Sequence, residues 1–170
     1  MKSFKQHINE EKDITKYSSK DLSNNGKHGK LNIVFSKFLY MDNSEQGKAA
    51  SGQPKEKEEG TALYMTITKD TSGKYLYPKN SFHVGYDRVN TDGQTVMGWA
   101  GTARLVTYYK SDAIAYIKKF GNVAFQKKQI EKGEKGRDSW PPTYDLTGDF
   151  KGQGPGSKIK KINNLDQIKY

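Results

Sequence analysis

The apolar residues of this 170-residue chain are concentrated in its middle, between Leu31 and Ile130. Residues 1–30 contain few side chains that could form a core, and residues 131–170 are rich in Gly, Lys and Pro. A stretch of about a hundred residues can bury one modest hydrophobic core but not two. We therefore expect one folded domain over 31–130, preceded by an N-terminal peptide and linker and followed by an extended tail.

Short runs of β-branched and aromatic residues predict several strands within this domain. They lie at 31–40, 61–68, 81–88, 105–109 and 123–129. Turn residues bound them, and the strongest turn signal is the Asn-Thr-Asp-Gly sequence at 90–93.

A single helix is predicted at 112–120, with Ser111 as its N-cap. One face of it carries Ala113, Ile114, Ile117 and Phe120. Gly121 is expected to end the helix in the left-handed conformation. Strands in a run with one late helix indicate an α+β fold, a small antiparallel sheet with one packed helix and flexible basic termini.

The formal charge of +10 is distributed unevenly. Residues 116–137 contain seven lysines and arginines against two acidic residues, and residues 151–170 contain five against one. This asymmetry favours a polyanionic partner, either nucleic acid, an acidic protein surface or anionic lipid. The alternative is that the lysines only keep a chain with few apolar residues in solution.

The residues expected to contact a polyanion follow from this count. They are Lys118, Lys119, Lys127, Lys128, Lys132, Lys135 and Arg137, with Lys158, Lys160 and Lys161 added by the tail. Because lysine greatly outnumbers arginine and no base-reading motif is present, we expect binding without sequence specificity. Aromatic residues stand among these lysines and are either stacking platforms for single strands or core residues: Tyr108, Tyr109, Tyr116, Phe120 and Phe125.

No pattern in the sequence points to catalysis. The chain has no Cys, and its three histidines, His7, His28 and His83, are not at metal-ligand spacing. No serine lies in a nucleophile motif, and paired carboxylates occur only in the charged run 56–59. We therefore expect a binding or assembly protein, not an enzyme, with no catalytic residue, metal, cofactor or small-molecule substrate. No run is long and apolar enough to insert into a membrane.

One segment resembles a known family. The sequence Met97-Gly98-Trp99-Ala100-Gly101-Thr102 resembles the MGW-[AT]-[ST]-[TS] signature of a small accessory subunit of respiratory complex I, the "ETC complex I subunit conserved region" family. Upstream, Ala49-Ala50-Ser51-Gly52 and Leu63-Tyr64-Met65 are similar to its conserved stretch and strand. Downstream, residues 105–116 are similar to its strand and helix. The resemblance covers 49–125 and implies a non-catalytic docking domain organised by Met97, Trp99 and Thr102, on the peripheral arm of a membrane complex.

The first eleven residues, MKSFKQHINEE, resemble the N-termini of large tailed-phage proteins, which target proteins into the prohead and are cleaved after Glu. Glu10 matches the cleavage position. This resemblance implies a virion-associated protein, located in the cytoplasm or the virion. Together the two resemblances predict an assembly protein in which a phage has reused an accessory-subunit-like domain. The alternative is a basic nucleic-acid-binding phage protein.

Overall fold

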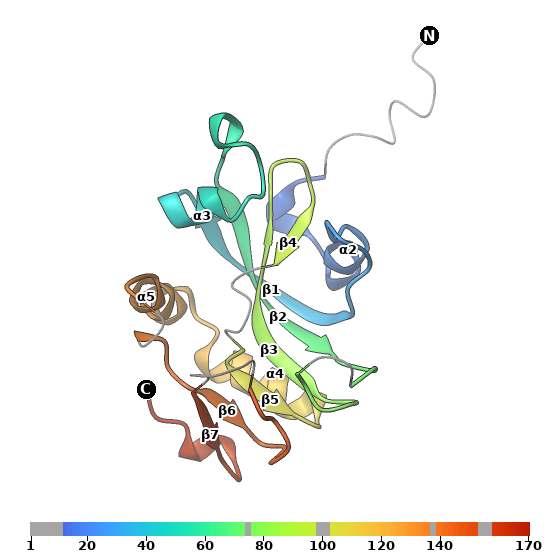
Figure 1. Cartoon of the computed structure of the whole chain (residues 1–170), viewed down its shortest axis with the longest axis vertical. Coiled ribbons are helices and arrows are strands. Elements are labelled where there is room, and N and C mark those ends of the chain that lie inside the picture. The colour runs from blue at the N-terminus through green and yellow to red at the C-terminus, as the bar shows by residue number, and fades with distance from the viewer. Residues whose placement is uncertain (1–11, 74–75, 98–102, 137–138, 153–157) are drawn as a thin grey trace.

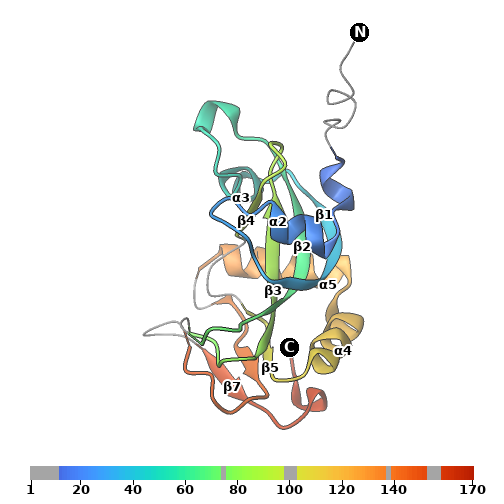
Figure 2. The ribbon, with the colours of Figure 1, turned by 90° about the vertical axis from the view of Figure 1, so that its right-hand side faces the viewer.

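The computed structural model describes residues 12–73, 76–97, 103–136, 139–152 and 158–170. One twisted sheet runs through the molecule, with helices on both of its faces (Figures 1 and 2). Its strands are β1 (Ile33–Asp42), β2 (Thr61–Lys69), β3 (Phe82–Val89), β4 (Thr95–Met97), β5 (Leu105–Thr107), β6 (Thr143–Asp145) and β7 (Ile159–Lys161). The predicted α+β class is therefore confirmed.

The sheet is mixed, so the prediction of an antiparallel sheet is wrong for two of the six strand pairs among the described residues. The strand order is β1-β2-β3-β5-β6-β7, and β4 also pairs with β3. The pairs among β1, β2, β3, β4 and β5 are antiparallel, whereas β5–β6 and β6–β7 are parallel. The connection from β5 to β6 contains the helices α4 (Lys110–Phe120) and α5 (Val123–Glu134), and a long crossover, usually helical, is what neighbouring parallel strands need.

Alternation along β2 divides the core into two parts. Leu63, Met65 and Ile67 pack on one face, against α4 (Lys110–Phe120) and α5 (Val123–Glu134). Ala62 and Tyr64 pack on the other face, against α2 (Ser19–Asn24). Because both faces are covered, seven consecutive residues of β2 are buried.

The segment 123–129, predicted as a strand, is the first part of helix α5. Asn122 is its N-cap, and the Asn122 side chain accepts a hydrogen bond of 2.8 Å from the backbone N–H of Phe125. The buried residues of the helix follow at helical spacing: Gln126, Gln129, Ile130 and Gly133. Two of these four are glutamines, so hydrophobicity alone did not reveal the helical period, although the N-cap was readable.

Helix α4 lies close to where the sequence predicts it, but its ends differ. Its N-cap is Tyr109, with no capping side chain, and Ser111 lies in the first turn. Gly121 ends the helix with φ −82°, so the predicted left-handed conformation is wrong. Glycine is needed there for space instead, because a Cβ atom would lie 2.3 Å from the carbonyl oxygen of Ile117.

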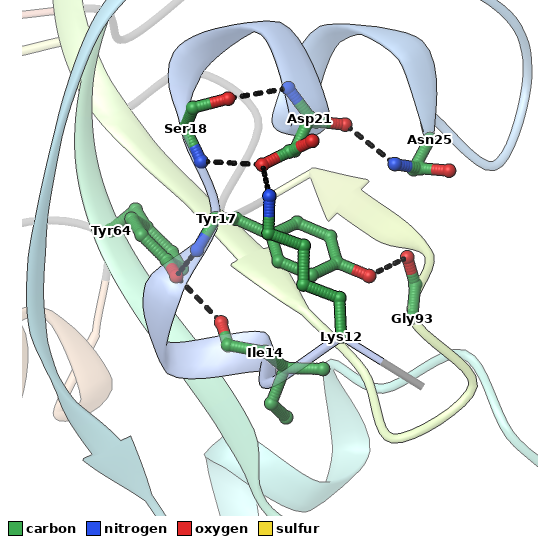
Figure 3. Close-up of polar contacts among 8 residues, drawn as sticks. All are labelled: Lys12, Ile14, Tyr17, Ser18, Asp21, Asn25, Tyr64 and Gly93. Carbon is green, nitrogen blue, oxygen red and sulfur yellow. Dashed lines mark hydrogen bonds and ion pairs between the residues drawn. The ribbon is translucent and has the colours of Figure 1, made fainter. Parts of the chain in front are cut away.

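Part of the predicted N-terminal linker is helix α2, docked onto the sheet (Figure 3). Ser18 and Asp21 form a reciprocal capping box, and Leu22 is fully buried. The Tyr64 hydroxyl donates a 2.5 Å hydrogen bond to the Ile14 carbonyl and accepts one of 2.9 Å from the Tyr17 N–H. With a single buried leucine, this segment has too little apolar periodicity to be recognised as structured.

The segment from residue 131, predicted as an extended tail, contributes to both sheet and core. Residues 131–134 belong to α5, and β6 and β7 extend the sheet. Tyr144, Ile162 and Ile168 are buried in the main core. Strands of three residues carry no readable period, which is why the sequence suggested a tail.

Candidate polyanion-binding surface

Helices α4 and α5 are consecutive, separated only by Gly121 and Asn122. Each is fixed to the sheet by its buried side, through Tyr116 and Ile117 on α4 and Ile130 on α5. Their outward sides carry six of the predicted residues, all exposed: Lys118, Lys119, Lys127, Lys128, Lys132 and Lys135. We call these six residues the α4–α5 lysine surface.

The lysines of α5 are placed by helical geometry. At 100° per residue, Lys128, Lys132 and the C-cap residue Lys135 lie on the side opposite the buried residues Gln126 and Ile130. Lys128 and Lys135 are about 10 Å apart along the helix axis, at 1.5 Å per residue. These three ammonium groups therefore form a row along one exposed side of the helix.

Few of these charges are neutralised within the fold. Lys119 Nζ lies 3.9 Å from Asp166 Oδ1, and both side chains are exposed. Lys127 Nζ lies 5.7 Å from the centre of the Tyr40 ring. In the part of the chain that the structure describes, the other four lysines form no ion pair with a carboxylate. Glu131 is the one exposed acid on α5 among the described residues.

The remaining predicted binding residues lie elsewhere. Arg137 falls outside the described residues. Lys158 precedes β7 and Lys160 and Lys161 belong to it, at the sheet edge opposite β1. Charged residues on an edge strand discourage pairing with another chain, so these lysines also protect the edge.

The three residues of the family-like signature cannot be described as a site. Trp99 and Thr102 lie outside the described residues. Met97 is the last residue of β4, and its backbone pairs with that of Asp87 on β3. The structure therefore places the start of this segment along one edge of β3 and leaves the docking role of Met97, Trp99 and Thr102 a prediction.

A buried ion pair was not anticipated from the sequence. Arg88 Nη1 donates hydrogen bonds to Asp42 Oδ2 at 2.8 Å and to Thr61 Oγ1 at 3.1 Å. Burial raises the pKa of Asp42, but hydrogen bonds from Ser44 and Arg88 outweigh it and hold that pKa below its usual range. Both charges are shielded from solvent, so the pair serves the fold and does not present a charged surface.

Two further titratable groups lie on β3, the buried Asp87 and the half-buried His83. Burial raises the pKa of Asp87 to about 7, and its carboxylate accepts a 2.7 Å hydrogen bond from Thr66 Oγ1. Burial also lowers the pKa of His83 to about 4, and its ring stacks on Tyr77 at 4.0 Å. Four residues of strand separate them by roughly 13 Å, too far for joint acid–base chemistry.

No family model, curated protein or solved structure matches this chain. Among the described residues, no three His, Asp or Glu side chains are grouped so that they could hold a metal ion. None of the described helices is both long and apolar enough to cross a membrane. The resemblance of residues 49–125 to the complex I accessory-subunit family remains a prediction.

Proposed function

We propose that this protein is a non-catalytic binding protein that holds the phosphate backbone of nucleic acid on its α4–α5 lysine surface. One observation carries the proposal. Exposed lysines stand on two helices anchored to the core, and most of them have no acidic partner among the described residues.

The physical driving force is the release of counterions. Cations are condensed along the phosphate backbone of free nucleic acid, and a lysine that neutralises a phosphate releases them to solution. Since α4 and α5 are held by buried residues such as Ile117 and Ile130, the lysine row needs no ordering of the backbone before it binds. Lysine is a flexible point charge, so the contact is independent of base sequence.

The two resemblances suggest the setting in which such a surface would work. A phage structural or virion-associated protein would meet packaged nucleic acid, whereas an accessory subunit of a respiratory complex would meet an acidic protein face. Neighbouring genes distinguish the settings: capsid and tail genes support the first, and respiratory-chain genes support the second.

Binding is tested by fluorescence anisotropy with a labelled generic duplex, over a range of salt concentrations, with an acidic protein as second ligand. We expect the logarithm of the affinity to fall linearly with the logarithm of salt, with a slope of about 0.9 per phosphate neutralised. The triple variant Lys128→Gln, Lys132→Gln, Lys135→Gln should weaken binding and reduce the slope by about 0.9 for each phosphate that is no longer neutralised.

A matched control removes three charges elsewhere, by Lys158→Gln, Lys160→Gln and Lys161→Gln around β7. Its smaller effect would locate the binding surface on α5. An equal loss of affinity in both triple variants would show that only net charge matters and would overturn the assignment to α4 and α5. Binding of the acidic protein but not the duplex would replace the nucleic acid with a protein partner.

A further inference from the structure

Aromatic rings from two distant parts of the sequence meet at the turn between α4 and α5. They belong to Phe120 at the end of α4, Phe125 in the first turn of α5, and Tyr170. The centre of the Tyr170 ring lies 5.1 Å from that of Phe120 and 5.0 Å from that of Phe125. The ring centres of the two phenylalanines are 5.7 Å apart. We call these three residues the turn aromatic cluster.

The cluster is open to solvent on one side and supported on the other. Tyr170 is 44% exposed, and Phe120 and Phe125 are half-buried. Beneath them, the buried ring of Tyr116 packs on Phe120 at 4.9 Å, and the buried ring of Tyr144 packs on Tyr170 at 5.7 Å. The rings are therefore held in place by the core while part of their surface remains in water.

The structure separates these rings from the other aromatic residues that accompany the lysines in the sequence. Tyr116 is completely buried and belongs to the core. Tyr109 is 68% exposed beside Lys110, but it makes no ring contact among the described residues. Of the described aromatic residues near these lysines, those of the turn aromatic cluster combine mutual ring contact, partial exposure and support from beneath.

Two lysines border this cluster. Lys119 Nζ lies 5.3 Å from the centre of the Phe120 ring. Lys128 follows Phe125 by three residues, which places the two side chains next to each other on the helix surface. Flat apolar rings bordered by ammonium groups match a ligand that offers flat bases and phosphates together.

We propose that the turn aromatic cluster is a stacking platform for unpaired bases, so that the α4–α5 lysine surface takes single-stranded nucleic acid in preference to duplex. This inference rests on the proposed function. In a duplex the faces of the bases are stacked on one another and are not accessible to the aromatic rings. An acidic peptide would contact the lysines alone. A single strand can contact both the rings and the lysines, since each of its bases has a free face for an aromatic ring and its phosphates bind the ammonium groups.

The first experiment compares three ligands of equal length on the full chain: a single strand, the corresponding duplex, and an abasic single strand. The abasic strand keeps the phosphates and lacks the bases. We expect the single strand to bind about tenfold more tightly than the abasic strand, the range that stacking of one or two bases supplies. Equal affinity for these two strands would overturn the inference and leave the proposed function standing.

The second experiment changes the rings. Phe125→Leu and Tyr170→Leu keep an apolar side chain but remove an aromatic ring on which a base can stack. Tyr170→Phe retains the aromatic ring. We expect both leucine variants to lose about tenfold affinity for the single strand and little for the duplex. The control Tyr109→Leu removes an exposed ring outside the cluster and should keep its affinity for both the single strand and the duplex.

The duplex measurement separates the possible failures. An equal loss of single-strand and duplex binding in the leucine variants would assign the rings a structural role and overturn the platform. Binding of neither ligand by the unaltered chain would instead overturn the proposed function itself.

Discussion

Arg88 on β3 and Asp42 on β1 form an ion pair across the intervening strand β2, with 2.8 Å between Nη1 and Oδ2. Their side chains are only 1% and 6% exposed. The same Nη1 donates to Thr61 Oγ1 on β2 at 3.1 Å, so one guanidinium joins three strands. Its Nε and Nη2 atoms are buried and find no hydrogen-bond partner among the described residues, which makes the place of Arg88 in the core costly.

Removing one partner of this pair should be strongly destabilising. Arg88→Met leaves the Asp42 carboxylate buried and unpaired, and we expect it to lower the free energy of unfolding by about 3–5 kcal/mol. Urea unfolding followed by circular dichroism measures this. The double variant Arg88→Met, Asp42→Leu should recover most of the loss, and Lys37→Met, at an exposed position of β1, should change stability by about 0.5 kcal/mol or less. An unchanged urea midpoint for Arg88→Met would contradict the prediction.

Asp87 should give the protein a characteristic pH dependence. Its folded pKa is raised from 3.8 to about 7, so between these values the folded state holds a proton that the unfolded chain has lost. Its contribution to stability is complete below pH 3.8 and falls as the pH rises to about 7. The unfolding free energy of the unaltered chain minus that of Asp87→Asn should therefore fall by about 1.4 kcal/mol per pH unit in this window.

His83 acts in the opposite direction and supplies the control. Burial lowers its pKa from 6.5 to about 4, so its contribution to stability rises with pH between these values. The unfolding free energy of the unaltered chain minus that of His83→Gln should therefore rise between pH 4 and pH 6.5. A pH-independent difference for Asp87→Asn, measured by denaturant unfolding at several pH values, would show that Asp87 is ionised in the fold.

The Tyr64 hydroxyl should control how the N-terminal segment docks (Figure 3). Tyr64→Phe removes the donor to the Ile14 carbonyl and the acceptor of the Tyr17 N–H, and we expect a loss of about 1–3 kcal/mol. Limited proteolysis should then cleave between residues 12 and 24 more rapidly. Tyr109→Phe, which alters an exposed hydroxyl, is the matched control, and equal cleavage rates in both variants would contradict the docking role.

Gly133→Ala gives a test in which two effects have opposite signs. Helix propensity alone predicts stabilisation by roughly 1 kcal/mol. In the folded chain, however, a Cβ atom at this position would lie 1.8 Å from Cε2 of Trp140. We expect the clash to dominate and to destabilise by about 1–3 kcal/mol, with a change in tryptophan fluorescence. A stabilised variant would mean that Trp140 does not pack on α5.

The long strands and helix α4 were predictable because their signals are local. The strands predicted at 31–40, 61–68 and 81–88 correspond to β1, β2 and β3, and the turn at 90–93 is present, with Gly93 at φ 81°. The exposure of the lysines on α4 followed from the helical period, since Ala113 and Ile117 define the buried side. The lysines on α5 are exposed for a different reason, because that segment is a helix and not the predicted strand.

Charge, the α+β class and the main strands were thus determined by the sequence itself, through composition and short-range periodicity. The tertiary structure decided what depends on distant residues: the parallel pairing of β6 and β7, the docking of α2, and the meeting of Tyr170 with Phe120 and Phe125. Asp42 and Arg88 are 46 residues apart, and no sequence pattern near either residue predicts their contact. Such contacts form because burial in a shared core offsets the cost of ordering the chain between them, and no local pattern records that balance.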